Sequence, residues 1–276
     1  MKQKFVFFMI FVIISVSPVF AQNKYTFSKF ADETVDFIKQ PAKWDGNDYI
    51  KIGLIGIGTG LSMFADQPIR NTFQKDQSYY YSFPIVIGRM YGELYSPVVF
   101  FGGFALYSLI ANDMGARKIA YEIGQASLYT GGLTFLLKMT IGRARPYMEE
   151  GPASYHPFES VFIQDYHAIP GGHSAAAFTI STVLSRNVKP VWLKALCYVP
   201  AVLTVSSRVY QDKHWFSDCV FGAAMGYYIA TWAVDKHEKN ANSYTKISLK
   251  EIMEHNQYQP IITGEFNGYS LIIKLL

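Results

Sequence analysis

Six segments of this chain have the length and pattern of helices, and most of them are apolar around nearly their whole circumference. They lie at residues 50–65, 96–112, 118–138, 174–187, 190–206 and 217–235. Because a helix without a polar face has to be buried, these segments are either core helices of a packed bundle or short membrane spans. A chain of 276 residues, of which 50% are hydrophobic, can supply one large core. We therefore predict an all-α fold built on six helices.

The N-terminus has the pattern of an export signal. Lys2 and Lys4 precede an apolar run over residues 5–16, which leads to the small residue Ala21. The run is shorter than the roughly 20 apolar residues that a membrane span needs, which favours cleavage over an uncleaved anchor helix. We predict that residues 1–21 are a signal peptide, cleaved after Ala21, and that the mature chain is exported.

The C-terminal tail, residues 236–276, contains a turn signal. Residues 261–266 and 269–274 flank the dipeptide Asn267-Gly268. Asn-Gly favours the type I′ turn that joins two antiparallel strands. We expect a short β-hairpin there.

The cysteines and the net charge bear on two questions, whether the chain forms a disulfide and whether it binds nucleic acid. Its two cysteines, Cys197 and Cys219, each lie in an apolar helical segment. Two helix-interior positions rarely meet disulfide geometry by chance, so buried free thiols are favoured over a single bridge. The formal net charge is +4, and no block of consecutive Lys or Arg is present to bind a nucleic-acid backbone. Nucleic acid is therefore not expected as a partner.

The first segment with chemical content lies at the end of the third predicted helix. It reads Lys138-Met-Thr-Ile-Gly-Arg-Ala-Arg145-Pro146. Lys138 and Arg145 are two helical turns apart and can share a face, although Pro146 biases Arg145 away from helical geometry. Taken alone, the segment is more typical of a basic helix end that complements the helix dipole.

The second segment, Pro170-Gly171-Gly172-His173-Ser174, opens the fourth predicted helix after a long connection. The exposed N–H groups at a helix start form a ready anion site, and two glycines let a ligand approach the backbone closely. His173 would stand beside that anion. Taken alone, the segment is equally compatible with an ordinary helix start.

The third segment joins the fifth and sixth predicted helices and runs from Ser207-Arg208 to His214 and Asp218. His214 and Asp218 are four residues apart, which on a helix lets the carboxylate accept a hydrogen bond from one imidazole nitrogen. The other nitrogen would then be unprotonated and nucleophilic. Arg208 adds a third cation.

Together, the three segments resemble the signature of the type 2 phosphatidic acid phosphatase (PAP2) and vanadium haloperoxidase superfamily. That signature runs Lys-x6-Arg-Pro, then Pro-Ser-Gly-His, then Ser-Arg-x5-His-x3-Asp. The resemblance covers about residues 95–235. It implies a six-helix PAP2/chloroperoxidase-like bundle with a catalytic core at 95–235, preceded by an N-terminal segment, 22–94, that holds the first core helix.

The resemblance also implies a mechanism of phosphate monoester hydrolysis. His214 would attack phosphorus and form a phosphohistidine, Asp218 would fix its tautomer, and His173 would protonate the leaving oxygen. No metal or other cofactor is implied, and vanadate should inhibit as a transition-state mimic. The phosphate oxygens would be held by Lys138, Arg145, Gly171, Gly172, Ser207 and Arg208.

One position departs from the signature, because Gly171 stands where the family has Ser. A hydroxyl donor to phosphate is thereby lost, while the backbone N–H remains. One neutral hydrogen bond is worth about 0.5–1.5 kcal/mol net, so we expect weaker binding and an intact mechanism.

Two other functions share these residues. A vanadium haloperoxidase would use the same ligands for vanadate, and a silent phosphate-binding protein would keep the cations and N–H groups. A binding protein needs neither a nucleophile nor an acid, so the presence of His214 and His173 favours an enzyme. Small exported chains with this signature are usually phosphatases, which favours a phosphatase over a haloperoxidase.

The substrate is not specified by the three segments, and lipid phosphates, isoprenoid phosphates and soluble esters all fit. The connection from Tyr147 to Ile169 could form a lid over an apolar chain, or its aromatic residues could simply pack the connection down. Those residues are Tyr155, His156, Phe158, Phe162 and Tyr166.

Membrane topology follows from the number of spans. A cleaved signal and six spanning helices would place the end of the third helix inside the cell, whereas the resemblance implies a site at the outer face. Five spans without the glycine-rich helix at 50–65, or a bundle that does not span, would each restore an outward site. The windows 97–111 and 219–234 are shorter than the roughly 17–25 residues of a span, which favours the bundle. We predict an active site that faces the periplasm and a body embedded in or resting on the membrane.

Overall fold

The computed structural model describes residues 25–158, 163–255, 261–266 and 269–274, and the side chains among them up to residue 239. The chain divides into two compact units, residues 1–45 and 46–276. The described part of the first unit is helix α2 (Phe27–Lys39) followed by the 3-10 helix η2 (Gln40–Lys43). The hydroxyl of Thr26 caps α2 by accepting a hydrogen bond from the N–H of Lys29.

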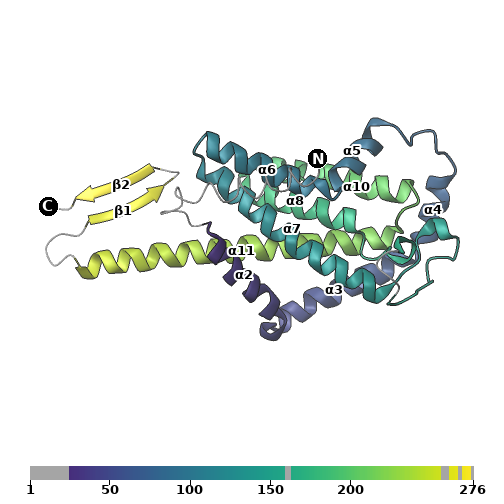
Figure 1. Cartoon of the computed structure of the whole chain (residues 1–276), viewed down its shortest axis with the longest axis horizontal. Helices are drawn as coiled ribbons and strands as arrows, with labels where there is room; N and C mark the ends of the chain where they lie inside the picture. Colours follow the sequence, from purple (N-terminus) through teal and green to yellow (C-terminus); the bar gives the residue numbers. More distant parts are fainter. Residues whose placement is uncertain (1–24, 159–162, 256–260, 267–268, 275–276) are drawn as a thin grey trace, which may run out of the picture. The chain divides into compact units, whose positions relative to one another are not determined.

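The second unit is almost entirely helical in its described residues, which confirms the predicted all-α class (Figure 1). A hairpin follows the last helix, and its strands pair antiparallel from Ile261 opposite Lys274 to Phe266 opposite Tyr269. The predicted turn itself, at 267–268, lies outside the described residues. The elements are α3 (Gly46–Met63), α4 (Asp66–Gln74), α5 (Phe83–Gly92), α6 (Tyr95–Ile110), α7 (Met114–Ile141), η3 (Pro146–Met148), η4 (Gln164–Tyr166), α8 (Gly172–Asn187), α9 (Val191–Leu196), α10 (Val199–Tyr210), α11 (Phe216–His255), β1 (Ile261–Phe266) and β2 (Tyr269–Lys274).

Helix α8 is the centre of the bundle. It packs against α7, α10 and α11, and α7 and α11 also contact each other (Figure 1). Around this centre, α5 packs on α10, and α6 packs on α7. Fully buried residues of α7, α8 and α11 form the main core: Ile123, Ala126, Val183, Ala230, Ala233 and Val234.

The helices differ from the predicted six in three ways. The segment expected at 190–206 is split into α9 and α10, because Pro200 lacks an N–H and its ring clashes with the preceding helical turn. The last helix runs on to His255 instead of ending at 235. Helices α2, α4 and α5 were not predicted, so the count of six is too low for the described residues.

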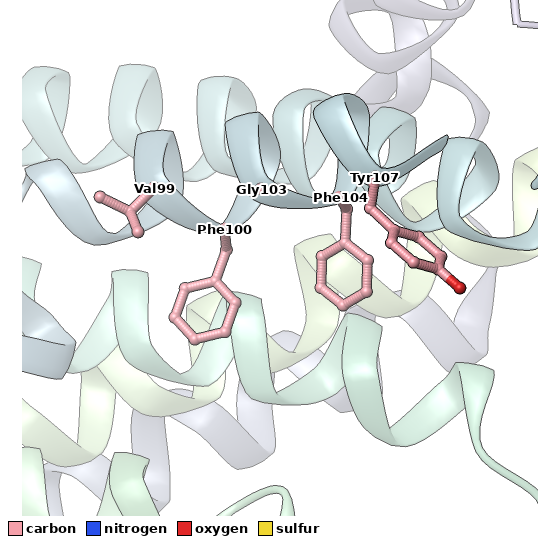
Figure 2. Close-up of a pocket in the computed structure, with 5 residues that line it drawn as sticks. All are labelled: Val99, Phe100, Gly103, Phe104 and Tyr107. Carbon is pink, nitrogen blue, oxygen red and sulfur yellow. The ribbon is translucent and has the colours of Figure 1, made fainter. Parts of the chain in front are cut away.

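Helix α6 has an apolar outer face. Val98 and Val99 are each 62% exposed, and Ile110 is 77% exposed. A groove of about 420 Å³ lies on this helix and is lined by Val99, Phe100, Gly103, Phe104 and Tyr107 (Figure 2). No single helix within the described ranges has the length and apolarity to cross a membrane, although α5 and α6, bent by 76° at their junction, pass that test as a pair.

Both cysteines are free thiols, as predicted. Cys219 is buried, whereas Cys197 is only partly covered. The described core is therefore held without a disulfide between these two positions, by packing of the apolar helix faces.

Candidate active site

The first predicted segment stays helical past the predicted end at 138 and then leaves the helix before Arg145. Helix α7 ends at Ile141, and Gly142 turns the chain with a left-handed φ of +64°. No residue with a side chain fits at this position, because its Cβ would collide with the carbonyl of His156. Arg145 therefore lies on extended backbone beyond the helix, and the prediction that Lys138 and Arg145 share a helical face is wrong.

Lys138 and Arg145 nevertheless lie close enough for their charges to interact. The Nζ of Lys138 donates to the carbonyl of His167 at 3.0 Å, and the Nε of Arg145 donates to the carbonyl of Gln164 at 2.8 Å. Burial, followed by the charge of Arg145, lowers the pKa of Lys138 to about 8. The cost of holding these two cations together indicates a place where an anion belongs.

His214 has a different hydrogen-bond partner from the one predicted. Its Nδ1 lies 2.8 Å from the carbonyl oxygen of Ala168 and 3.8 Å from Oδ2 of Asp218. Since a carbonyl can only accept, Nδ1 carries the proton and donates to Ala168. The expectation that Asp218 fixes this tautomer by a direct hydrogen bond is therefore not met by the distances.

The other ring nitrogen of His214 has no hydrogen-bond partner among the described residues and is buried. With the proton on Nδ1, Nε2 keeps its lone pair. Burial and the neighbouring cations hold the pKa of His214 well below its ordinary value. The imidazole is thus neutral and nucleophilic at neutral pH.

Asp218 instead organises the start of α11. Its Oδ2 accepts the N–H of Trp215 at 2.8 Å, and its Oδ1 accepts from the guanidinium of Arg143. Asp218 stands at the third position of α11, so its bond to Trp215 is half of a capping box. The carboxylate also lies at the positive end of the helix dipole.

Arg143 is a buried residue of this site that the sequence analysis did not single out. Its guanidinium lies between two carboxylates, those of Asp218 and Asp66, and all three side chains have 0% exposure. Asp66, at the start of α4, also accepts the N–H of Ser217 at 2.8 Å and its hydroxyl at 2.6 Å. Arg143 lies within the first motif and could have been considered, but nothing in the sequence pairs Asp66 with it.

The second segment forms the N-terminus of α8 as expected. The first-turn N–H groups of Gly172, His173 and Ser174 have no acceptor within the helix. The N–H of Gly171, however, donates to the carbonyl of Asp218 at 2.8 Å, so it is already bonded and the predicted donor is taken. A Cβ on Gly171 would lie 2.9 Å from that same carbonyl oxygen, which explains why this residue has no side chain here.

His173 stands beside His214, with their ring centroids 5.9 Å apart. Burial lowers the pKa of His173 to about 2, with further lowering by His214 and the surrounding cations. Its Nε2 lies 3.6 Å from a carboxylate oxygen of Glu93, a residue that the sequence analysis missed.

Ser207 and Arg208 complete the set from the last turn of α10. The hydroxyl of Ser207 and the Nε of Arg208 are both buried, and neither has a hydrogen-bond partner among the described residues. The Nη2 of Arg208 donates to Gln211 at 2.7 Å, and burial lowers the pKa of this arginine. A buried donor without a partner costs about 1–3 kcal/mol, a cost that an oxyanion at this place would remove.

The connection from Tyr147 to Ile169 is tied to itself and to the end of α7. His156 donates its N–H to Gly142 and stacks on Tyr166 with 4.1 Å between ring centroids. Tyr155 faces Arg143, and Phe158 is 80% exposed. The aromatic residues therefore do not form one common cover, and Phe162 lies outside the described residues.

The fold is all-α, and buried polar atoms without a partner among the described residues gather around His214 at the starts and ends of its helices. Residues 122–241 match the model of the PAP2 superfamily. Among the described residues, no group of three or more His, Cys, Asp or Glu side chains is placed to hold a metal ion.

One curated relative is similar to about half of the chain. It is the lipid A 1-phosphatase of Porphyromonas gingivalis, which is 27% identical over 147 residues. The aligned region covers 51% of this chain and 29% of the relative, so the chain matches less than a third of that protein's length. No solved structure matches the chain.

Proposed function

We propose that this protein is a phosphatase that hydrolyses lipid phosphate monoesters through a phosphohistidine on His214. The observation that carries the proposal is the state of His214. Its Nε2 is buried, unprotonated and without a partner among the described residues, while its Nδ1 is held by Ala168. A protein that only binds phosphate needs donors and cations, and has no use for a buried nucleophile.

The remaining groups have complementary roles. In phosphoryl transfer, charge collects on the equatorial oxygens, which Lys138, Arg208 and Arg145 would stabilise together with the first-turn N–H groups of α8. His173 would give its proton to the departing oxygen and later take one from the attacking water. Asp218 contributes negative charge near the ring of His214, and no metal ion takes part.

A lipid substrate is supported by two features. The relative from P. gingivalis is named for its action on lipid A, and the exposed apolar face and groove of α6 could lie against acyl chains (Figure 2). Export through residues 1–21, which lie outside the described part, would bring the site to the periplasmic side. The body would then be embedded in, or rest on, the outer surface of the membrane.

The proposal is tested by turnover of purified protein on phosphatidic acid, lipid A, isoprenyl phosphate and a soluble ester, with EDTA present. We expect release of phosphate from the lipids, competitive inhibition by vanadate, and acid-labile label on His214 after a short reaction with labelled substrate. Label on His173 or on a serine would contradict the mechanism. Bromide oxidation by vanadate-loaded protein without phosphate release would assign a haloperoxidase instead.

Sidedness is tested by a cysteine in place of Glu150, in a background with Cys197→Ser. We expect it to react with a membrane-impermeant thiol reagent when only the outer barrier of the cell is opened. The same chain without the new cysteine is the matched control. Reaction only after complete lysis would contradict an outward-facing site.

A further inference from the structure

Glu93 is held at the rim of the site by close packing. It lies between α5 and α6, directly after Gly92. A Cβ on Gly92 would lie 3.1 Å from Cβ of His173 and would collide with Thr204, so the end of α5 is seated against both α8 and α10. The position of Glu93 relative to His173 is therefore fixed by the backbone.

The carboxylate of Glu93 reaches two residues of the site. One oxygen lies 3.6 Å from Nε2 of His173 and the other lies 3.9 Å from Nη1 of Arg208. The side chain of Glu93 is 33% exposed, whereas that of Arg208 is only 5% exposed. Glu93 thus lies at the edge of the pocket, where a substrate would enter and a leaving group would depart.

His173 needs such a partner if it is to donate a proton. Burial and the neighbouring cations strongly disfavour its protonated form, with a pKa of about 2. Opposite charge within about 4–6 Å favours the charged form of a titratable group. The charged and titratable groups that lower the pKa of the His173 ring are His214, Arg208, Lys138 and Arg145. The carboxylate that faces its Nε2 is that of Glu93.

We propose that Glu93 is a positioning residue that holds Nε2 of His173 and favours its imidazolium, which leaves Nδ1 to protonate the departing oxygen. This role rests on the proposed phosphatase function. As the bond between His214 Nε2 and phosphorus forms, the ester bond to phosphorus breaks and the proton on Nδ1 passes to the ester oxygen. Water then attacks phosphorus, the bond to His214 breaks, and a proton of that water returns to Nδ1 of His173.

Glu93 could instead serve only to hold Arg208. That role would affect binding of the phosphoryl group, which every substrate shares. Arg208 also has a shorter bond, at 2.7 Å, to Gln211. A role in holding the imidazolium of His173 acts on proton transfer to the leaving group in the first step, and leaving groups can be varied independently.

The experiment compares Glu93→Gln with wild type on two soluble esters of similar size, p-nitrophenyl phosphate and benzyl phosphate. The nitrophenolate departs without a proton, whereas the benzyl alkoxide requires one. Because general acid catalysis contributes about 10²–10⁴-fold, we expect kcat on benzyl phosphate to fall about 10–100-fold and kcat on p-nitrophenyl phosphate to change less than about 3-fold. Glu93→Asp should recover part of the loss. Glu238→Gln, which contacts Lys118 and Arg186 instead of the site, is the matched control.

A second measurement does not depend on turnover. With inorganic phosphate bound, the pKa of His173, followed by NMR, should be about 1 unit lower in Glu93→Gln than in wild type. Equal losses on both esters, or an unchanged pKa of His173, would overturn the role of Glu93 and leave the phosphatase function standing. A wild-type protein inactive on every phosphate ester would instead overturn the proposed function, and this role with it.

Discussion

The imidazole of His214 donates from Nδ1 to the backbone carbonyl of Ala168 at 2.8 Å. Ala168 is itself held, because its N–H donates to the carbonyl of Arg143 at 3.1 Å. The tautomer of the proposed nucleophile is therefore set by backbone that the first motif positions. The side chain of Arg143 at the same time binds Asp218, so one residue connects both groups that flank the ring.

The first prediction distinguishes the role of Ala168 from that of Asp218 in setting the tautomer of His214. In Asp218→Asn, the proton of His214 should stay on Nδ1, because the bond to Ala168 remains. ¹⁵N NMR of the ring nitrogens reports this directly. The free energy of unfolding of the variant should nevertheless be about 3 kcal/mol lower, because Arg143 loses a buried anionic partner. A shift of the proton to Nε2 would show that Asp218 sets the tautomer after all.

The second prediction concerns the two histidines. His214→Ala should lower kcat by at least about 10³-fold, because it removes the nucleophile. His173→Ala should lower kcat by about 10²–10⁴-fold on alkyl phosphates, through loss of the general acid. Initial rates with phosphatidic acid and benzyl phosphate measure both. Near-normal rates in His214→Ala would contradict the covalent route.

The third prediction concerns stability. Arg143→Ala should lower the free energy of unfolding by about 3–5 kcal/mol, because Asp66 and Asp218 would remain as buried, uncompensated charges. Arg186→Ala is the matched control. It removes a half-exposed ion pair with Asp235 and should cost no more than about 1 kcal/mol. Denaturant titration followed by circular dichroism compares them, and equal losses would contradict a structural role for Arg143.

The fourth prediction concerns pH. The pKa of Lys138 is about 8, so in the free protein this group loses its charge as the pH rises through that value. The pocket then has one positive charge fewer, and kcat/KM should fall above about pH 8. Lys138→Arg should remove this decline, because guanidinium stays charged. Exposed Lys189→Ala should retain it, and a pH profile of kcat/KM for all three proteins decides the matter.

The fifth prediction concerns the position that departs from the family signature. From sequence alone, Gly171→Ser restores a hydroxyl donor and should preserve or raise activity. The structure predicts the opposite, because a Cβ would lie 2.9 Å from the carbonyl oxygen of Asp218. Overpacking of this kind costs about 1–3 kcal/mol. Gly171→Ala and Gly171→Ser should lose stability equally, and a more active Ser variant would contradict this reading of position 171.

Much of the fold could be predicted because hydrophobic pattern is a local property. The long apolar segments that became α6, α7 and α8 are clear at the level of single helices. Helix α4 was missed because its sequence is mostly polar, and its role depends on Asp66 reaching residues far along the chain. Such a contact is created by tertiary packing and leaves no periodic signal.

The sequence predicted which residues lie near one another at the candidate site, but not which groups they hydrogen-bond to. The three motifs gave Lys138, His173, His214 and the other proposed ligands, since their spacing is fixed along the chain. They could not show that Ala168 is the partner of His214, because a backbone carbonyl has no residue type to recognise. Glu93 was not predicted for a related reason, because it belongs to none of the motifs and reaches the site only through the packing of α5.

The close approach at Gly171 also restricts how this protein can change over generations. A Cβ on Gly222 would collide with the carbonyl of Gly171, just as one on Gly171 would press on Asp218. A larger residue at either position destabilises the fold unless the start of α11 first moves away from α8. A mutation toward the family serine is therefore conditional on earlier changes along α11, and descendants of this sequence would reach it by a sequence of steps whose order matters.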